Sequence, residues 1–327
     1  MTSGICTLFE DHYHYGVAAL TNSVYSQGYK GSIYAGFRGA LPVWASSAKE
    51  NLSIDWPESK TLTVASDLHI HFLPVNTNYH LTNYKPDFML RLLGGPAKEC
   101  GALFYFDPDI IVTAPWTFFN DWVNCGIALC EDVNSPLAEH HPRRMAWRRY
   151  FGSKDIELTY RECTYANGGF LGIRKSDLSF LEMWQRLQVE MSPVIGGLHR
   201  SALSGPPLPF EADGPFAPFG KTDQDALNAT VEAWTGKISF IGKEGMAFKS
   251  GLAIMPHALG QPKPWKWKPL TQALAGSPPR VVDREYWKAA NSTILTQPLN
   301  LVRHRKLCIN IAAFIGRFYR RGGNSEY

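Results

Sequence analysis

The sequence predicts an α/β fold in which helices cover a sheet that carries a ligand site at one edge. Three observations lead to this prediction. Strand and helix patterns alternate over the first hundred residues, which is typical of parallel, helix-covered strands. A fully apolar strand, 102–106, is followed at once by two aspartates, Asp107 and Asp109. The composition, 45% hydrophobic and 13% aromatic over 327 residues, provides for a sizeable core.

The first half of the chain supplies the alternating elements. Apolar runs predict strands at 4–10, at 31–39 and within 61–75. Apolar residues spaced three or four apart predict helices at 15–28 and 84–93. The apolar strand 102–106 follows, and in sheets of this kind ligands bind beyond the carboxyl ends of the strands. We therefore expect the site at Asp107 and Asp109.

The second half continues with longer loops. It predicts a strand at 167–173, a helix over 176–191 with Ser176 as its N-cap, and a helix over 222–234 capped by Thr222. The stretch 204–220 is too rich in Pro and Gly for a regular element, and we expect it to close over a bound ligand. The Pro-rich segment 277–280 marks the predicted boundary between a domain of residues 1–276 and a C-terminal extension, 277–327.

Charge and cysteine usage exclude several classes. Of the 33 Lys and Arg residues, six lie in 301–327 beside one acidic residue, so the body of the chain is close to neutral. This pattern argues against nucleic-acid binding. The 6 cysteines form no CxxC pair, which favours free thiols in a reducing, cytoplasmic compartment over a zinc site. The first residues lack the basic and apolar segments of a secretory signal.

The C-terminal extension contains a basic amphipathic helix. On a helical wheel one face collects Leu307, Ile311, Phe314, Ile315 and Phe318, with Ile309 as an exception, and the flanks carry Arg303, Lys306, Arg317, Arg320 and Arg321. Such a helix fits an anionic membrane surface, so we expect a peripheral location on the inner face of a membrane. The alternative is a helix docked on the body with its arginines in water.

The two aspartates indicate a metal site. Like charges so close together repel each other unless a cation lies between them. Hard oxygen ligands suit Mn²⁺ or Mg²⁺, which keep open positions for phosphate oxygens. A later segment, 255–267, adds His257 as a third ligand, with Gly260 and Lys263 suited to hold phosphate. The alternatives are a solvated turn for the aspartates and an ordinary surface loop for the histidine.

Taken together, these two segments resemble glycosyltransferase family 8. Two further segments agree in order and spacing, 165–184 (YANGGFLGIRKSDLSFLEMW) and 222–228 (TDQDALN), so the resemblance covers about residues 4–268 in segments. It implies a GT-A fold, a single Rossmann-like domain whose mixed sheet is flanked by helices. It also implies a UDP-sugar donor bound through Mn²⁺ (or Mg²⁺).

The resemblance assigns roles to individual residues. Asp107, Asp109 and His257 would bind the metal, and Asp107 would also touch the ribose. Gly260 and Lys263 would hold the diphosphate, and Leu8 and Glu10, where the family often has Ala and Asp, would contact the nucleoside. Tyr13 could stack on the base or serve in packing, and Lys85 or Arg91 would reach the donor. Asn167, Asp223 and Gln224 would line the donor-sugar pocket.

The resulting hypothesis is a hexosyltransferase that acts on a glycan or glycolipid acceptor and retains the anomeric configuration. An inverting enzyme that uses another nucleotide sugar would need a carboxylate base, for which Glu131 or Asp132 are candidates. A third alternative is a catalytically degenerate GT-A protein that binds sugar nucleotides or glycans as a scaffold. The alternating Asp67, His69 and His71 resemble a metal triad, but polar residues on a strand are the simpler interpretation.

Overall fold

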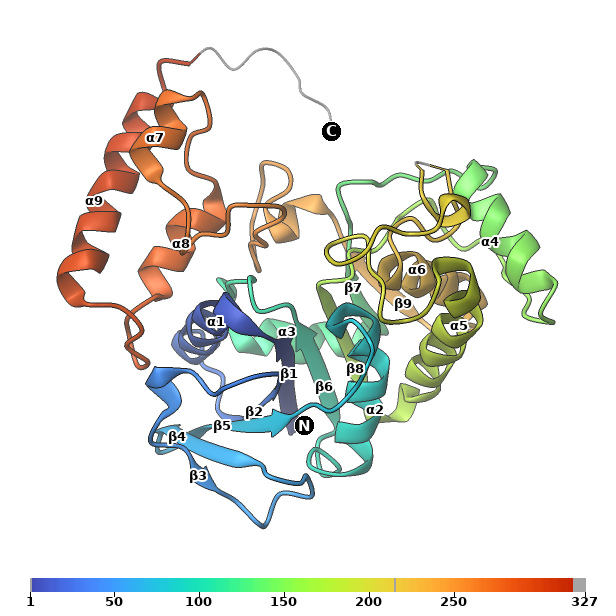
Figure 1. Ribbon diagram of the computed structural model, residues 1–327, viewed down its shortest axis with the longest axis horizontal. Helices are drawn as coiled ribbons and strands as arrows, with labels where there is room; N and C mark the ends of the chain where they lie inside the picture. The colour runs from blue at the N-terminus through green and yellow to red at the C-terminus, as the bar shows by residue number, and fades with distance from the viewer. Residues whose placement is uncertain (1, 215, 320–327) are drawn as a thin grey trace.

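A single sheet organises the chain in the computed structural model, which describes residues 2–214 and 216–319 (Figure 1). In the described residues the sheet has nine strands in the order β3-β4-β5-β2-β1-β6-β8-β7-β9. Their bounds are β1 Ser3–Phe9, β2 Gly31–Phe37, β3 Lys49–Glu50, β4 Lys60–Ala65, β5 Leu68–Pro74, β6 Ala102–Phe106, β7 Ile127–Cys130, β8 Phe170–Arg174 and β9 Ile238–Ile241.

The sheet is mixed rather than all-parallel. The strands β5, β2, β1 and β6 run parallel, whereas β8 pairs antiparallel with β6 and with β7. The parallel strands that the alternating pattern predicts extend from β5 to β6, and the mixed sheet implied by the family resemblance is confirmed. The antiparallel strand β8 follows a long connection, 131–169, which separates it from β7.

The segment 61–75 holds two strands where one was expected. A turn at Asp67 separates β4 from β5, and the two strands pair antiparallel. His71 on β5 is buried between β4 and β2, where Nδ1 lies 2.9 Å from Thr61 Oγ1 and Nε2 lies 3.0 Å from Ser32 Oγ. Burial lowers the pKa of His71 to about 4. Both ring nitrogens thus have partners within the sheet, which favours the interpretation of these histidines as polar strand residues.

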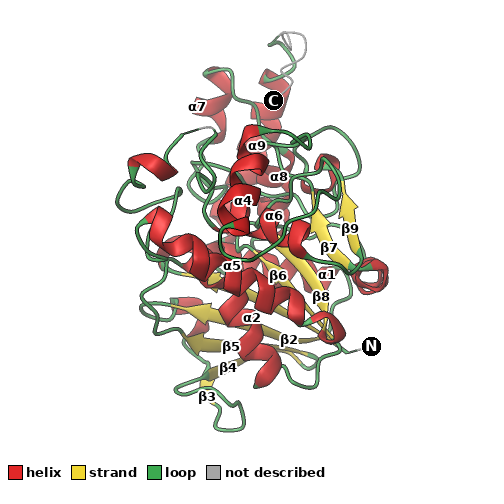
Figure 2. Ribbon diagram, turned by 90° about the vertical axis from the view of Figure 1, so that its right-hand side faces the viewer, coloured by secondary structure: helices red, strands yellow, loops and turns green. Residues whose placement is uncertain are grey.

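Helices cover both faces of the sheet (Figure 2). Alternate residues of β6 belong to two different buried clusters, as expected for side chains that point to opposite faces. One cluster packs under α2, α5 and α6, and the other under α1 and α3. The helix bounds are α1 His14–Ser26, α2 Lys85–Gly94, α3 Trp116–Trp122, α4 Pro142–Gly152, α5 Ser179–Ile195, α6 Asp223–Ala233, α7 Pro269–Leu274, α8 Val281–Ala289 and α9 Leu299–Ile315.

Two predicted caps differ from the structure. Ser176 lies in a short 3-10 helix, Lys175–Asp177, and α5 begins at Ser179 after Leu178. Thr222 does precede α6, but it takes an unusual backbone conformation with φ +39° and makes no side-chain cap bond. A β-branched residue at positive φ is strained, and such strain persists only where the surroundings hold it.

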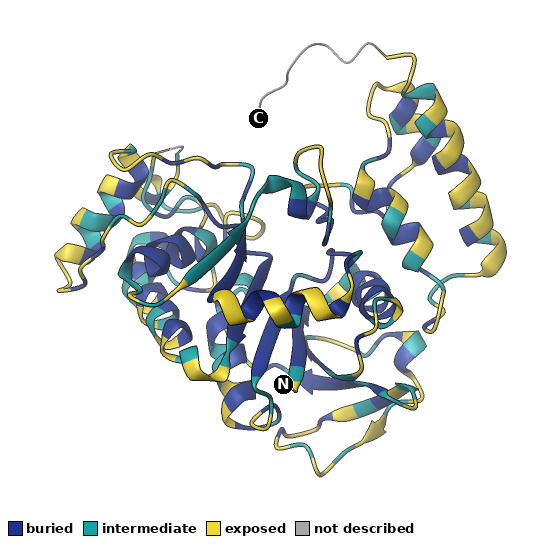
Figure 3. Cartoon of the chain, turned by 180° about the vertical axis from the view of Figure 1, so that it is seen from behind, coloured by how far each residue is buried: buried dark blue, intermediate teal, exposed yellow. Residues whose placement is uncertain are grey.

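The helices α7, α8 and α9 lie together beside the sheet (Figure 1). The helices α8 and α9 share a third buried cluster with α1, to which Trp265, Tyr286, Trp287 and Ile309 contribute, and α7 packs against α9. The outer side of α9 is largely exposed (Figure 3). None of the helices described by the structure has the length and apolar character needed to cross a membrane. The predicted flanking residues Arg320 and Arg321 lie outside the described residues.

Candidate active site

Residues 107–109, here called the acidic turn, lie at the end of β6, at the centre of the sheet. The backbone N–H of Asp107 donates to Gly169 O (2.7 Å), which ties the turn to the start of β8. The helix α1 approaches so closely that a Cβ on Gly16 would meet Pro108 O at 2.1 Å. Only glycine fits there, because a backbone oxygen cannot move aside as a flexible side chain can.

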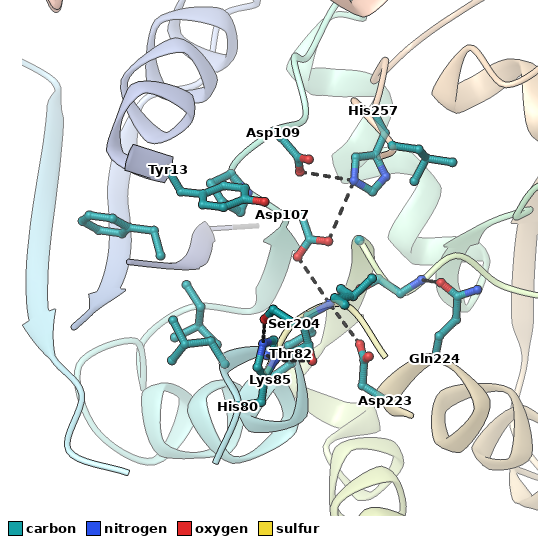
Figure 4. A pocket seen from close by; sticks show the side chains of 18 of the residues that line it. Tyr13, His80, Thr82, Lys85, Asp107, Asp109, Ser204, Asp223, Gln224 and His257 are labelled. Carbon is teal, nitrogen blue, oxygen red and sulfur yellow. Dashed lines mark hydrogen bonds and ion pairs between the residues drawn. The ribbon is translucent and has the colours of Figure 1, made fainter. Parts of the chain in front are cut away.

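His257 reaches the acidic turn through a short antiparallel bridge. Ile110 pairs with His257, and the N–H of Ala258 donates to Asp109 O (3.1 Å). As a result Nε2 of His257 lies 3.2 Å from Asp109 Oδ1 and 3.9 Å from Asp107 Oδ2 (Figure 4). Gly169 permits this approach, since a Cβ there would meet His257 Cε1 at 2.5 Å.

Asp107, Asp109 and His257 form a set that fits a divalent metal. One ligand atom from each lies within 4.8 Å of the others, and Asp109 and His257 are buried. Two carboxylate oxygens and one imidazole nitrogen are ligands that Mn²⁺ and Mg²⁺ accept. Burial alone would raise the pKa of Asp109, but the neighbouring His257 and Lys263 outweigh it and hold the pKa well below its usual range. The carboxylate is therefore ionised, as a ligand must be.

Lys85 connects the acidic turn to the start of α6. Its Nζ lies 3.3 Å from Asp107 Oδ1 and 3.1 Å from Asp223 Oδ2, and it donates to Gly168 O at 2.8 Å. Burial would lower the pKa of Lys85, but the two carboxylates outweigh it and raise the pKa. Burial raises the pKa of Asp223, and Lys85 offsets this only in part. One buried ammonium group thus serves two carboxylates.

Asn167 and Gln224 hold the turn that leads into β8. The Oδ1 of Asn167 accepts from Gly169 N (2.9 Å), and its Nδ2 donates to Asp132 Oδ2 (2.6 Å). The Oε1 of Gln224 accepts from Gly168 N (3.0 Å). Both amides therefore have fixed orientations. Asp132, an alternative base in the sequence analysis, is buried and serves to position Asn167.

The loop after His257 places a second cation at the acidic turn. The Nζ of Lys263 lies 2.5 Å from Asp109 Oδ2 and donates to Ala258 O at 2.7 Å. It also lies 5.7 Å from the centre of the Tyr13 ring. Tyr13 in turn meets Trp265 edge-on, with ring centres 5.7 Å apart. Tyr13 thus serves in packing in this structure, and its position at the cavity wall also suits stacking on a base.

Glu10 directly follows β1 and lines the same cavity as Tyr13. Its carboxylate lies 3.7 Å from Arg38 Nη1, and Arg38 is held by the carbonyls of Thr77 and Tyr79. The Glu10 side chain offers hydrogen-bond acceptors at the cavity wall.

A cavity of about 440 Å³ unites these residues. Of the residues predicted from sequence, Leu8, Glu10, Tyr13, Lys85, Asp107, Asp109, Asn167, Asp223, Gln224, His257, Gly260 and Lys263 line it. Arg91 does not, because its guanidinium lies over the Trp56 ring, 3.5 Å from its centre. The volume falls within the usual range for small-molecule sites.

Sequence reasoning missed one wall of the cavity. His80 and Thr82 line it beside Leu203 and Ser204, from the beginning of the long Pro- and Gly-rich loop. The Nε2 of His80 lies 2.9 Å from Ser204 Oγ, which joins the loop to the segment before α2 (Figure 4). No local pattern marks a contact between residues so far apart in the chain.

Comparison with solved structures identifies the fold. The chain is similar to the galactosyltransferase LgtC in complex with donor and acceptor sugar analogues, with TM-score 0.50 and 15% identity, over 92% of this chain and 99% of that one. The glycosyltransferase GlyE of Streptococcus pneumoniae TIGR4 gives TM-score 0.50 and 13% identity, over 95% and 64%. The bifunctional glycosyltransferase WbbM gives TM-score 0.49 and 12% identity, over 94% of this chain, which spans about half (52%) of that one.

The similarities to LgtC and GlyE confirm the GT-A fold of glycosyltransferases, and at such identities they establish the fold alone. No protein-family model matches the sequence, and no curated protein matches it. Membership of glycosyltransferase family 8 therefore stays a prediction.

Proposed function

We propose that this protein is a metal-dependent glycosyltransferase that moves a hexose from a UDP-sugar to a glycan or glycolipid acceptor, with retention of configuration. The observation that carries the proposal is the convergence of Asp107, Asp109 and His257 beside Lys263 in one cavity of a GT-A fold. Two acids, an imidazole and a lysine at one point are the groups needed to bind a metal and a diphosphate.

Different residues of the site would bind the metal, the diphosphate and the nucleoside. Asp107, Asp109 and His257 would hold a divalent ion, which would supply Lewis-acid stabilisation for the charge on the leaving diphosphate. Lys263 adds a second positive charge at the same place. Tyr13, Leu8 and Glu10 form the wall suited to the nucleoside, which orients the donor before reaction.

The donor-sugar side favours retention by front-face attack. Asp223 is engaged by Lys85, and Gln224 offers only a neutral amide, which is a poor nucleophile. The acceptor hydroxyl then attacks on the face that the diphosphate leaves, and its proton passes to the departing phosphate oxygen. An inverting route would require a carboxylate at the acceptor, and the involvement of Asp132 with Asn167 argues against it.

The experiment that tests the function is UDP release from a panel of UDP-hexoses and UDP-N-acetylhexosamines, with Mn²⁺ or with EDTA. We expect slow hydrolysis of one donor that requires Mn²⁺ and accelerates when the acceptor is added. If none of the UDP-sugars is turned over while Mn²⁺-dependent UDP binding persists, the scaffold alternative is favoured. Turnover of GDP- or dTDP-sugars only would correct the donor class.

We further propose that α9 attaches the enzyme to an anionic membrane surface. The helix docks on the body through Val302, Ile309 and Ala312, so the docked alternative describes one of its faces. The opposite face carries an exposed apolar stripe: Leu307 58%, Ile311 42% and Phe314 57%, and Phe318, in the turn after α9, is 75% exposed. Arg303 and Lys306 are exposed along one flank of this stripe, and Arg317 is exposed just after the helix. The cytoplasmic side remains the prediction from the cysteines.

Replacing Leu307 and Phe314 together by Ser is expected to lower binding to vesicles of phosphatidylglycerol and phosphatidylcholine by about a hundredfold or more, because each buried apolar side chain contributes roughly 1.5–3 kcal/mol. Co-sedimentation measures the bound fraction. Val189→Ser, at an exposed position of α5, is the matched control. Equal binding by all three proteins would contradict the attachment. Hydrolysis of the soluble donor should stay unchanged.

A further inference from the structure

Arg280, which lies beyond the predicted domain boundary, forms hydrogen bonds to the loop that carries Gly260 and Lys263. Arg280, which directly precedes α8, donates from Nη1 to Leu259 O at 2.8 Å and from Nη2 to Pro262 O at 3.4 Å. The two carbonyls flank the turn at Gly260, whose φ of +68° lies in the left-handed region. One planar guanidinium therefore fixes both ends of this turn.

Arg280 is itself fixed by a buried carboxylate. Its Nε lies 2.9 Å from Asp283 Oδ2, and its Nη2 lies 2.9 Å from Asp283 Oδ1. Asp283 is fully buried, so the pair has little freedom to rearrange. One turn later on the same helix, Trp287 Nε1 donates to Pro264 O (3.2 Å). The helix α8 thus holds the loop at three carbonyl groups.

The anchored carbonyls decide where the loop's N–H groups point. The peptide bonds Leu259–Gly260 and Pro262–Lys263 are trans, so each C=O and the N–H of the next residue point in opposite directions. With both carbonyls turned toward Arg280, the N–H groups of Gly260 and Lys263 turn away from it. Within the described part of the chain, neither N–H donates to a protein acceptor.

These free donors belong to residues that line the cavity. Gly260 and Lys263 both contribute to its wall, and the Lys263 ammonium lies at the same place beside Asp109. Successive backbone N–H groups in a concave turn bind anions, and a nearby lysine strengthens this binding. Two backbone N–H groups and one ammonium group at this wall therefore suit phosphate oxygens.

We propose that Arg280 is a positioning residue of the donor site, which aims the N–H groups of Gly260 and Lys263 at the diphosphate of the nucleotide sugar. This inference rests on the function proposed above and assigns a role to α8 in it. The C-terminal extension accordingly forms part of the donor site, although the sequence places it outside the predicted domain of residues 1–276.

The test separates binding of the diphosphate from binding of the nucleoside. UDP is titrated by calorimetry and uridine by ligand-observed NMR, both with Mn²⁺, against the full chain, Arg280→Lys and Arg280→Met. We expect UDP to bind about tenfold more weakly to both variants, because each loses at least one hydrogen bond that orients the loop, while uridine affinity stays constant. Arg284→Met removes an exposed arginine from the same helix and should change neither affinity.

Each other outcome overturns the inference in a distinct way. Unchanged UDP affinity in Arg280→Lys and Arg280→Met, or an equal loss for uridine, refutes the positioning role and leaves the proposed function intact. If the unaltered protein binds none of UDP, GDP and dTDP with Mn²⁺, the proposed function and this inference fail together. Should Arg280→Met unfold because Asp283 is left unpaired, Arg280→Lys decides the question, since its ammonium still neutralises Asp283.

Discussion

Asp109→Asn is expected to lower the rate of sugar transfer by about a thousandfold, with little change in the shape of the site. The amide has nearly the volume of the carboxylate, but it has no charge with which to hold a divalent cation. It also weakens the contact to Lys263, now 2.5 Å from Asp109 Oδ2. Affinity for Mn²⁺ should therefore fall together with the rate, as expected if the carboxylate acts through the metal.

The measurement is UDP release at saturating donor over a Mn²⁺ titration, beside equilibrium Mn²⁺ binding in the absence of donor. Asp121→Asn, at an exposed position of α3, is the matched control and should behave like the unaltered protein. Residual activity in Asp109→Asn should be insensitive to EDTA. Unchanged Mn²⁺ affinity, with or without a loss of rate, would show that Asp109 is not a metal ligand and would remove the central support for the proposed mechanism.

The two aspartates of this site could be predicted because neighbouring residues in the sequence mark them. Asp107 and Asp109 interrupt a fully apolar strand, and charges rarely follow such a strand without a partner. His257 is a candidate ligand by residue type, and the family resemblance supports its placement beside the aspartates. Its bridge to Ile110 joins segments far apart in the chain. Periodicity reports which face of an element is buried, and it carries no information about which distant segment lies opposite.

The parts that sequence reasoning missed share a physical cause. His80 meets Ser204 through a contact between irregular segments, where no apolar periodicity exists. Arg280 lies in a Pro-rich stretch that predicts a domain boundary. Its guanidinium nevertheless donates to carbonyls 18 and 21 residues earlier in the chain. In each case the deciding interaction is tertiary, and the residues are of common type.

In the basic segment 139–155, arginines on α4 face a buried acid. Arg144 and Arg148 pair with Glu232, whose side chain is fully buried on α6. Arg144 also donates to the carbonyls of Glu162 and Thr164. These arginines hold α4 against α6, the helix that begins at Asp223. A cluster of arginines in a sequence therefore need not face solvent or a ligand, because a buried carboxylate from a distant segment can be its partner.

Lys85→Met is expected to destabilise the protein by about 3 kcal/mol and to abolish transfer. Met keeps the length and apolar stem of the side chain but removes the ammonium group that serves both Asp107 and Asp223. The side chains of Lys85 and Asp223 are 3% and 7% exposed, so water cannot replace the lost partner. The cost is that of an uncompensated buried carboxylate, and urea unfolding at neutral pH with EDTA measures it.

A double-mutant cycle with Asp223→Asn separates this electrostatic effect from the loss of packing. Because Asn carries no charge, Asp223→Asn should restore about 1–3 kcal/mol in the Lys85→Met background while destabilising the unaltered protein. Lys175→Met, at an exposed position, is the control for removal of a lysine charge. Transfer should not return in the double variant, since Asp107 keeps its excess charge and the donor-sugar side has lost both members of the pair. Additive effects of the two substitutions would mean that Lys85 supports the fold by packing alone, and its assignment to the donor site would then have no energetic basis.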